Sequence, residues 1–142
     1  MSLLYFNAEY AIKTHDKIIE ISGGLNGIKN RGNLESPLLH IQNDDYYPSM
    51  EEKITHLVFT INKNHAFNDG NKRSSIALGA FFLELNGLDI LVSRFIREME
   101  NFAVHVANNK VDKELLLEIV TSLIYEADFS EELKIKIIIS LQ

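Results

Sequence analysis

Residues 49–87 read SMEEKITHLVFTINKNHAFNDGNKRSSIALGAFFLELNG, and this stretch decides the fold. Apolar residues recur at helical spacing on both sides of a polar centre. Ser49 and Glu52 form a capping box, in which each side chain satisfies the backbone N–H of the other. Between the two apolar patterns, residues 68–71 are a dense turn signal, Asn-Asp-Gly-Asn. The stretch therefore predicts two helices, over about 49–65 and 71–85, joined by a short polar loop.

The helical pattern continues on both sides of this central pair. Gly23-Gly24 ends a first helix, and residues 23–33 carry four glycines and three asparagines, which predicts a loop or a tight hairpin. We predict residues 88–92, a short apolar run, to be extended. Further helices are predicted over about residues 34–41 with Pro37 in the first turn, 93–108 capped by Ser93, 112–126 capped by Asp112, and from Ser130 onward.

These elements define a fold class. Because the sequence has no repeat, linker or low-complexity tract, we expect one compact all-α domain over residues 1–142, with the central helix–loop–helix as its spine. The apolar end of the chain, Ile135 to Leu141, is expected to pack into the core rather than to form a partner or dimer surface.

Composition and charge exclude several classes of protein and of functional site. The chain has 142 residues, with 14 Lys+Arg, 20 Asp+Glu and a net charge of -6, which disfavours a general nucleic-acid-binding protein. The sequence contains no cysteine, which excludes disulfide scaffolds, iron–sulfur clusters and thiol nucleophiles. No secretory or membrane segment is recognisable, so we expect a cytoplasmic protein.

The loop of the central pair, His65 to Arg73, concentrates titratable, amide and cationic groups. A helix N-terminus exposes unpaired N–H groups that attract phosphate, and Gly70 lets the backbone approach an anion. Cations in the first turn, Lys72 and Arg73, are disfavoured by the helix dipole unless they bind such an anion. Asp69 can share Mg²⁺ with phosphate oxygens, and His65 can take a proton from an attacking hydroxyl.

A plainer interpretation stays open on composition alone. A loop between two helices is often rich in Asn, Asp and Gly because it turns, and a Lys-Arg pair can be a solvated face. Phe67, which is apolar within a polar loop, should turn inward and anchor the loop on the core. A zinc site at His65 and Asp69 is a weaker alternative, because no third ligand lies nearby in the sequence.

The order of the loop residues resembles a known signature. His65-x-Phe67-x-Asp69-Gly70-Asn71-Lys72-Arg73 fills every specified position of the Fic/Doc family loop, and the lysine before the arginine is typical of the Doc (death-on-curing) branch. Segments that resemble Doc-type flanks occur in the right order at residues 15–20, 27–36 and 82–87. The resemblance covers roughly residues 10–90.

The resemblance implies roles for particular residues. His65 would be the general base on a target hydroxyl, and Asp69 would hold Mg²⁺. The nucleotide phosphates would bind four residues at the start of the second central helix: Gly70, Asn71, Lys72 and Arg73. The flap that aligns the target peptide in this family would correspond to Lys29, Asn30 and Arg31.

For the whole chain, the resemblance implies the toxin of a toxin–antitoxin system. Such an enzyme would be a Mg²⁺-dependent phosphotransferase that moves a phosphoryl group from ATP to a hydroxyl side chain of a protein. By resemblance the target would be elongation factor Tu, so that translation stops. A small antitoxin protein would restrain the enzyme by inserting a helix next to the active site.

The alternatives are tied to departures from the family pattern. Transfer of AMP to a protein hydroxyl is the first, but Ile76 stands where AMP-transferring members carry a second arginine. A catalytically silent binding protein is the second, and it has no need for the complete motif. A helical DNA-binding regulator lacks a basic recognition helix. The target is also open, since Lys29-Asn30 stands where the family often has Arg-Asp. Self-inhibition by Ser122-x-x-x-Glu126 is disfavoured, because Ala127 breaks that pattern.

Overall fold

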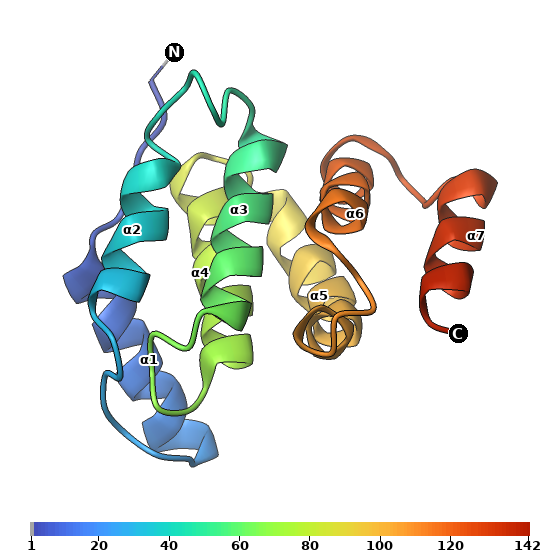
Figure 1. Ribbon diagram of the computed structural model, residues 1–142. Coiled ribbons are helices and arrows are strands. Elements are labelled where there is room, and N and C mark those ends of the chain that lie inside the picture. The colour runs from blue at the N-terminus through green and yellow to red at the C-terminus, as the bar shows by residue number, and fades with distance from the viewer. Residues whose placement is uncertain (1) are drawn as a thin grey trace.

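The computed structural model describes residues 2–142, and within them the chain is helical with no strand. The predicted all-α class is therefore confirmed (Figure 1). In chain order the elements are α1 (Ala8–Ser22), α2 (Gly32–His40), α3 (Met50–Lys63), α4 (Asn71–Leu85), the 3₁₀ turn η1 (Asp89–Leu91), α5 (Val92–Ala107), α6 (Lys113–Tyr125) and α7 (Glu131–Ser140).

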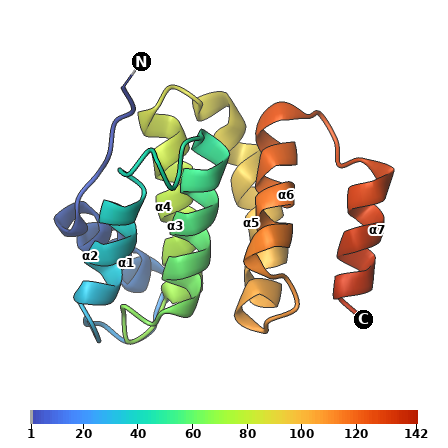
Figure 2. The same ribbon diagram turned by 45° about the horizontal axis from the view of Figure 1, so that its top comes forward.

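Helices α3 and α4 lie side by side at the centre of the fold. Helices α1 and α2 cover one side of this pair and α5 and α6 the other, while α7 stands at the outer edge (Figure 2). Core residues of the two helices, such as Leu57 of α3 and Leu78 of α4, are fully buried. Gly79 permits the close approach, because a Cβ there would lie 2.8 Å from Val58 Cγ2 and 2.9 Å from Phe95 Cζ.

Most predicted helix ends are confirmed. Helix α4 spans Asn71–Leu85 as predicted, and the side chains of Asp112 and Ser130 cap α6 and α7 by accepting backbone N–H bonds at 2.8 and 3.1 Å. The capping box of α3 is half confirmed. Ser49 Oγ accepts from the Glu52 N–H at 3.2 Å, but the Glu52 carboxylate accepts from the Ser49 hydroxyl and not from its backbone N–H.

Helix α2 begins at Gly32, two residues earlier than predicted, so Pro37 lies inside the helix and not in its first turn. A proline there has no N–H for the carbonyl of Asn33, four residues back. Asn64 Nδ2 satisfies that carbonyl instead, at 2.6 Å, and Asn33 Nδ2 donates in return to Asn64 O at 2.8 Å. The reciprocal pair ties α2 to the residue directly before His65.

The prediction of an extended segment at residues 88–92 is wrong. The Leu88 N–H donates to Leu83 O at 2.9 Å, which turns the chain back at the end of α4, and the Leu91 N–H donates to Leu88 O at 3.0 Å. The apolar run therefore forms η1 and leads directly into α5 at Val92. Ser93 consequently lies inside α5 and does not cap it.

The terminal helix α7 keeps part of its apolar surface in contact with solvent. Leu133 and Ile137 are buried, whereas Ile135, Ile138 and Ile139 are 56%, 58% and 63% exposed. The expectation of core packing is therefore wrong for these three isoleucines. Among the helices of residues 2–142, none combines the length and the apolar character that crossing a bilayer requires.

A row of three nitrogen groups joins α6, α3 and α2. Lys113 Nζ donates to His56 Nδ1 at 2.7 Å, and His56 Nε2 lies 3.0 Å from His40 Nδ1. Because an ammonium only donates, Nδ1 of the neutral His56 ring is the acceptor and Nε2 carries the proton. Tyr47 packs on the same ring at 4.3 Å. Burial, and secondarily the charges of Lys113 and His40, lower the pKa of His56 to about 4.

Mild acid should therefore destabilise the fold through His56. Unfolded His56 takes up a proton near pH 6.5, whereas in the folded state it does so only near pH 4, so the unfolded state binds more protons between these values. This contribution to stability is complete above about pH 6.5, and about 3 kcal/mol of it is lost as the pH falls to about 4. Urea unfolding as a function of pH measures it. His56→Gln should flatten the profile and His105→Gln should not; an unchanged profile in His56→Gln would refute the assignment.

Candidate active site

The polar loop between α3 and α4 is held by the segment that follows α1. The Asn68 N–H donates to Gly27 O at 3.1 Å, and the N–H groups of Lys29 and Asn30 donate to Ala66 O at 2.8 and 3.0 Å. These bonds surround an isolated antiparallel bridge between Ile28 and Phe67, in the segment predicted as a loop or hairpin. The segment therefore lies against the loop as a flap attached by its backbone.

Phe67 anchors the loop to the hydrophobic core. It is fully buried, and its ring stacks on His15 of α1 with 3.8 Å between centroids and 4° between the ring planes. His15 Nε2 is also 2.6 Å from the carbonyl oxygen of Asp69. Since a carbonyl oxygen only accepts, Nε2 of His15 carries a proton. One buried imidazole thus contacts both the apolar anchor and the backbone of the candidate metal ligand.

Asn71 folds the loop back on itself. Its Oδ1 accepts from the Phe67 N–H and its Nδ2 donates to the Phe67 carbonyl, each at 3.0 Å. The side chain predicted to line an anion cradle is therefore occupied by the backbone of the loop. Gly70 precedes α4 in the left-handed region, at φ 78° and ψ 18°. The first intrahelical bond runs from the Ser74 N–H to Gly70 O, which leaves the amides of residues 71–73 outside the helical ladder.

Asp69 is a carboxylate fixed by backbone donors. Its Oδ2 accepts from the Leu25 N–H at 3.1 Å and its Oδ1 from the Gly70 N–H at 2.8 Å. These two bonds, in that order, hold the pKa of Asp69 below its ordinary value, so the group is ionised. Gly24 is required beside it, because at φ 124° an added Cβ would lie 2.6 Å from Asp69 Oδ2.

Asp69 suits a magnesium ion that it shares with phosphate oxygens of a bound ligand. Within residues 2–142, no group of three or more His, Asp or Glu side chains gathers to form a metal cage. Magnesium is usually held by one or two carboxylates together with substrate phosphates and water, so the ionised Asp69 suits an ion that a nucleotide brings with it. The zinc alternative at His65 and Asp69 still has no third protein ligand among these residues.

Arg73 reaches across to the end of α1. Its Nη1 donates to Ser22 Oγ at 2.5 Å and to Gly23 O at 2.9 Å, while Nη2 lies 3.9 Å from Asp69 Oδ1. Lys72, the neighbouring cation, is exposed. His65 is exposed as well and has a left-handed backbone, with φ 53°. Histidine tolerates that conformation better than most non-glycine residues. In this position His65 lines the cavity beside the loop.

Six of the predicted site residues line one cavity of about 380 Å³, whereas Phe67, Lys29 and Asn30 do not. The predicted residues in its lining are His65, Asp69, Gly70, Asn71, Lys72 and Arg73. The lining also contains three residues to which the sequence analysis assigned no role: Asn62, Asn68 and Ala107. Arg31 does not line the cavity either. Its guanidinium lies 2.6 Å from the Glu9 carboxylate and 3.5 Å from that of Glu35, which places it at the start of α2.

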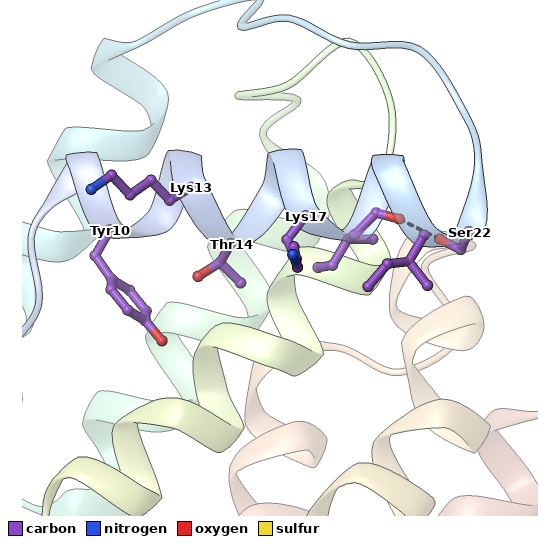
Figure 3. A pocket seen from close by; sticks show the side chains of 7 residues that line it. Tyr10, Lys13, Thr14, Lys17 and Ser22 are labelled. Atoms are coloured by element: carbon purple, nitrogen blue, oxygen red, sulfur yellow. Dashed lines mark hydrogen bonds between the residues drawn. The ribbon is translucent and has the colours of Figure 1, made fainter.

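A second depression runs along α1 and ends near the site. Figure 3 shows Tyr10, Thr14 and Lys17 projecting from one side of the helix, with Ser22 at its end. The cavity has a volume of about 540 Å³ and also includes Lys13, Ile18 and Ile21. Ser22 donates to Ile18 O at 2.7 Å and accepts from Arg73, so a residue of the groove is bonded to a residue of the candidate active site.

Sequence reasoning missed the residues that hold the loop from a distance. Nothing in the local sequence of His15 connects it with Asp69, 54 residues later. Gly24 was recognised as a helix terminator, but its close approach to Asp69 was not. Tyr125, beside Glu126 of the disfavoured self-inhibitory segment, bonds to Glu51 at the start of α3, the end of that helix opposite to His65.

Known proteins share this sequence pattern. The family model described as "Fic/DOC family" matches residues 5–83, which include the flap and the whole loop. The chain is 30% identical over 111 residues to "Protein kinase doc" of Escherichia phage P1, a match that covers 75% of this chain and 85% of that protein. It is 29% identical over 94 residues to "Toxin Doc" of Mycolicibacterium smegmatis, covering 63% and 72%.

Removing the His15 hydrogen bond should loosen the loop without emptying the core. His15→Phe keeps an aromatic ring against Phe67 but leaves the Asp69 carbonyl without its partner, which should cost about 1–3 kcal/mol. Hydrogen exchange should show faster exchange at the amides of residues 66–70, with little change in α6. His105→Phe is the control. Exchange in the loop that equals the wild-type rate would contradict this role for His15.

Proposed function

The chain belongs to the Fic/Doc family, and from this membership we propose that it is a Doc-type toxin that transfers a phosphoryl group from ATP to a hydroxyl side chain of a protein. The target by resemblance is elongation factor Tu, whose modification would stop translation. A translation factor as target and a small antitoxin as partner imply that the protein acts in the cytoplasm.

One observation carries the proposal: the cavity at the start of α4 brings together three kinds of group that phosphoryl transfer uses. His65 presents an exposed imidazole, Asp69 is an ionised carboxylate, and the amides of residues 71–73 with Lys72 and Arg73 offer donors to phosphate. Phosphoryl transfer depends mainly on positioning and charge stabilisation, and these groups supply both.

In the proposed reaction the target hydroxyl oxygen attacks the γ-phosphorus of ATP. The hydroxyl proton passes to a ring nitrogen of His65, and the bond from the γ-phosphorus to the β–γ bridging oxygen breaks, which releases ADP. Asp69 would hold Mg²⁺, which neutralises phosphate charge when it is bound. Arg73 would turn from Ser22 and Gly23 toward the phosphates, or bind them while it keeps these bonds.

The γ-phosphoryl group is favoured over AMP by the residue at position 76. Ile76 packs against the core at the position where AMP-transferring members carry a second arginine. With one cationic phosphate contact fewer, the site is less suited to hold the α-phosphate as the reacting group. The name of the phage P1 relative, a protein kinase, agrees with this choice.

Labelled ATP tests the reaction. The protein is incubated with Mg²⁺, purified elongation factor Tu and ATP labelled at either the α- or the γ-phosphate. We expect label on the target from the γ position only. Label from the α position would establish AMP transfer and refute the kinase assignment, and no label from either, with no nucleotide binding, would favour the silent binding protein.

The choice of variant at position 65 decides how clearly the base is tested. His65 has a left-handed backbone, which alanine adopts poorly and asparagine well, so His65→Asn removes the imidazole with less strain. We expect transfer to fall by about 10²–10⁴-fold. Lys134→Ala on α7 is the matched control, and activity in His65→Asn equal to that of this control would exclude His65 as the base.

We place the antitoxin in the groove along α1. Its apolar residues, Tyr10, Ile18 and Ile21, lie beside the two lysines Lys13 and Lys17, so it suits an amphipathic helix with acidic residues along one edge (Figure 3). Ile21 is 75% exposed, so its apolar side chain is available for contact with a partner in this groove. A helix in this groove would end at Ser22 and therefore contact the residues that hold Arg73.

Co-expression tests this partner and its place together. We expect the chain alone to arrest growth, and the small protein encoded next to it to restore growth. Ile21→Glu should keep the arrest but abolish the rescue, because a carboxylate replaces an apolar contact. Ile135→Glu, at another exposed isoleucine site, on α7, should still be rescued. Rescue that is unaffected by Ile21→Glu would exclude this groove.

A further inference from the structure

Asn62 is a buried amide at the wall of the candidate active site. It lies in the last turn of α3, only 4% of it is exposed, and it lines the same cavity as His65 and Ala107. Its Nδ2 donates to the carbonyl oxygen of Ala103 in α5 at 3.0 Å. Its Oδ1 has no hydrogen-bond partner. Nδ2 of Asn62 thus links α3 to α5, whereas Oδ1 makes no hydrogen bond within the fold.

An acceptor of this kind is uncommon in a native protein. The large majority of buried side-chain polar atoms are hydrogen-bonded, and leaving one unpaired costs about 1–3 kcal/mol. Four side-chain oxygens of the described residues are in this state, and of these only Asn62 Oδ1 belongs to a residue that lines the cavity beside His65. Asn62 lines the cavity and its Nδ2 is fixed to α5, so Oδ1, itself buried, is the atom of this side chain left to accept a hydrogen bond once a bound ligand shifts the wall that covers it.

The rest of the cavity offers a different chemistry. Lys72 and Arg73 only donate, both amide atoms of Asn71 are bonded to Phe67, and Asp69 carries a negative charge. The wall formed by Asn62 and Ala107 is uncharged and comes from α3 and α5, whereas the cationic groups come from α4. Phosphate oxygens only accept, so they gain nothing from a second acceptor. Oδ1 of Asn62 therefore suits a part of the ligand that donates.

We propose that Asn62 Oδ1 accepts a hydrogen bond from the nucleoside part of the bound nucleotide. A nucleoside has two kinds of donor, the ribose hydroxyls and the amino group of adenine, and either would satisfy this oxygen. The inference rests on the proposed function, because it assumes that the phosphates of the same nucleotide bind at the start of α4. Asn62 is then the residue that distinguishes a nucleoside triphosphate from a bare polyphosphate.

Calorimetric titration of wild type and Asn62→Leu with Mg-ATP and with Mg-tripolyphosphate tests this inference. Leucine has a similar volume but no acceptor. We expect Asn62→Leu to bind Mg-ATP about tenfold more weakly and Mg-tripolyphosphate with unchanged affinity. Ser74→Ala is the control, since it also removes a buried unpaired oxygen but does not line the cavity.

Each other outcome has a separate meaning. Equal weakening for both ligands would show that Asn62 only supports the structure, and undiminished affinity for Mg-ATP would show that Oδ1 does not contact the nucleotide; both refute the inference and leave the phosphotransferase intact. Wild type that binds neither ligand would refute the proposed function, and the inference with it. The wild-type titrations therefore test the function, and the comparison with Asn62→Leu tests the residue.

Analogues identify the donor. Titrations with 2′-deoxy-ATP, 3′-deoxy-ATP and purine riboside triphosphate, which lacks the amino group, are made on both proteins. The analogue that lacks the bonded donor should bind wild type and Asn62→Leu equally, while the other two keep the tenfold difference. A tenfold difference that persists with all three analogues would refute a direct bond between Asn62 and either donor.

Discussion

The candidate active site depends on the way Phe67 is held, by burial of its ring and by the hydrogen bonds of its backbone to Asn71. The ring lies in the core against His15, and its N–H and carbonyl are both bonded to the side chain of Asn71, the first residue of α4. A loop with that residue fixed has little remaining freedom. The positions of the Asp69 carboxylate and of the left-handed Gly70 follow from it, and so does the direction in which the free amides of α4 point.

The site is assembled from parts that are distant in the sequence. The flap from residues 24–30 and His15 hold one side of the loop, while Asn62 and Ala107 form another wall through α3 and α5. The family match ends at residue 83, so the wall contributed by α5 lies outside it. The matched residues contain the candidate groups of the loop, and α5 closes the cavity beside them from outside that match.

The sequence alone predicted the class of fold, most helix ends and the loop residues, because these depend on local signals: periodicity, caps and turn residues. Prediction from the sequence failed where contacts between residues far apart in the chain determine the structure. Pro37 stands inside α2 because Asn64 supplies a donor to the carbonyl that the proline leaves free. Three isoleucines of α7 stay exposed although their composition suggests a core. The roles of His15, Gly24 and Asn62 depend on neighbours 40 or more residues away, which no local pattern encodes.

The clamps on the loop have a consequence for the order of events during synthesis. Lys63 Nζ donates to Val106 O and to Asn109, and Asn62 donates to Ala103 O, so the wall beside His65 needs residues that leave the ribosome some forty positions after it. Domains acquire such long-range contacts only when the participating segments are available together. A nascent chain that ends within α4 has the whole signature but lacks one wall of its cavity. The cavity of the proposed translation inhibitor is thus completed only after α5 has been synthesised.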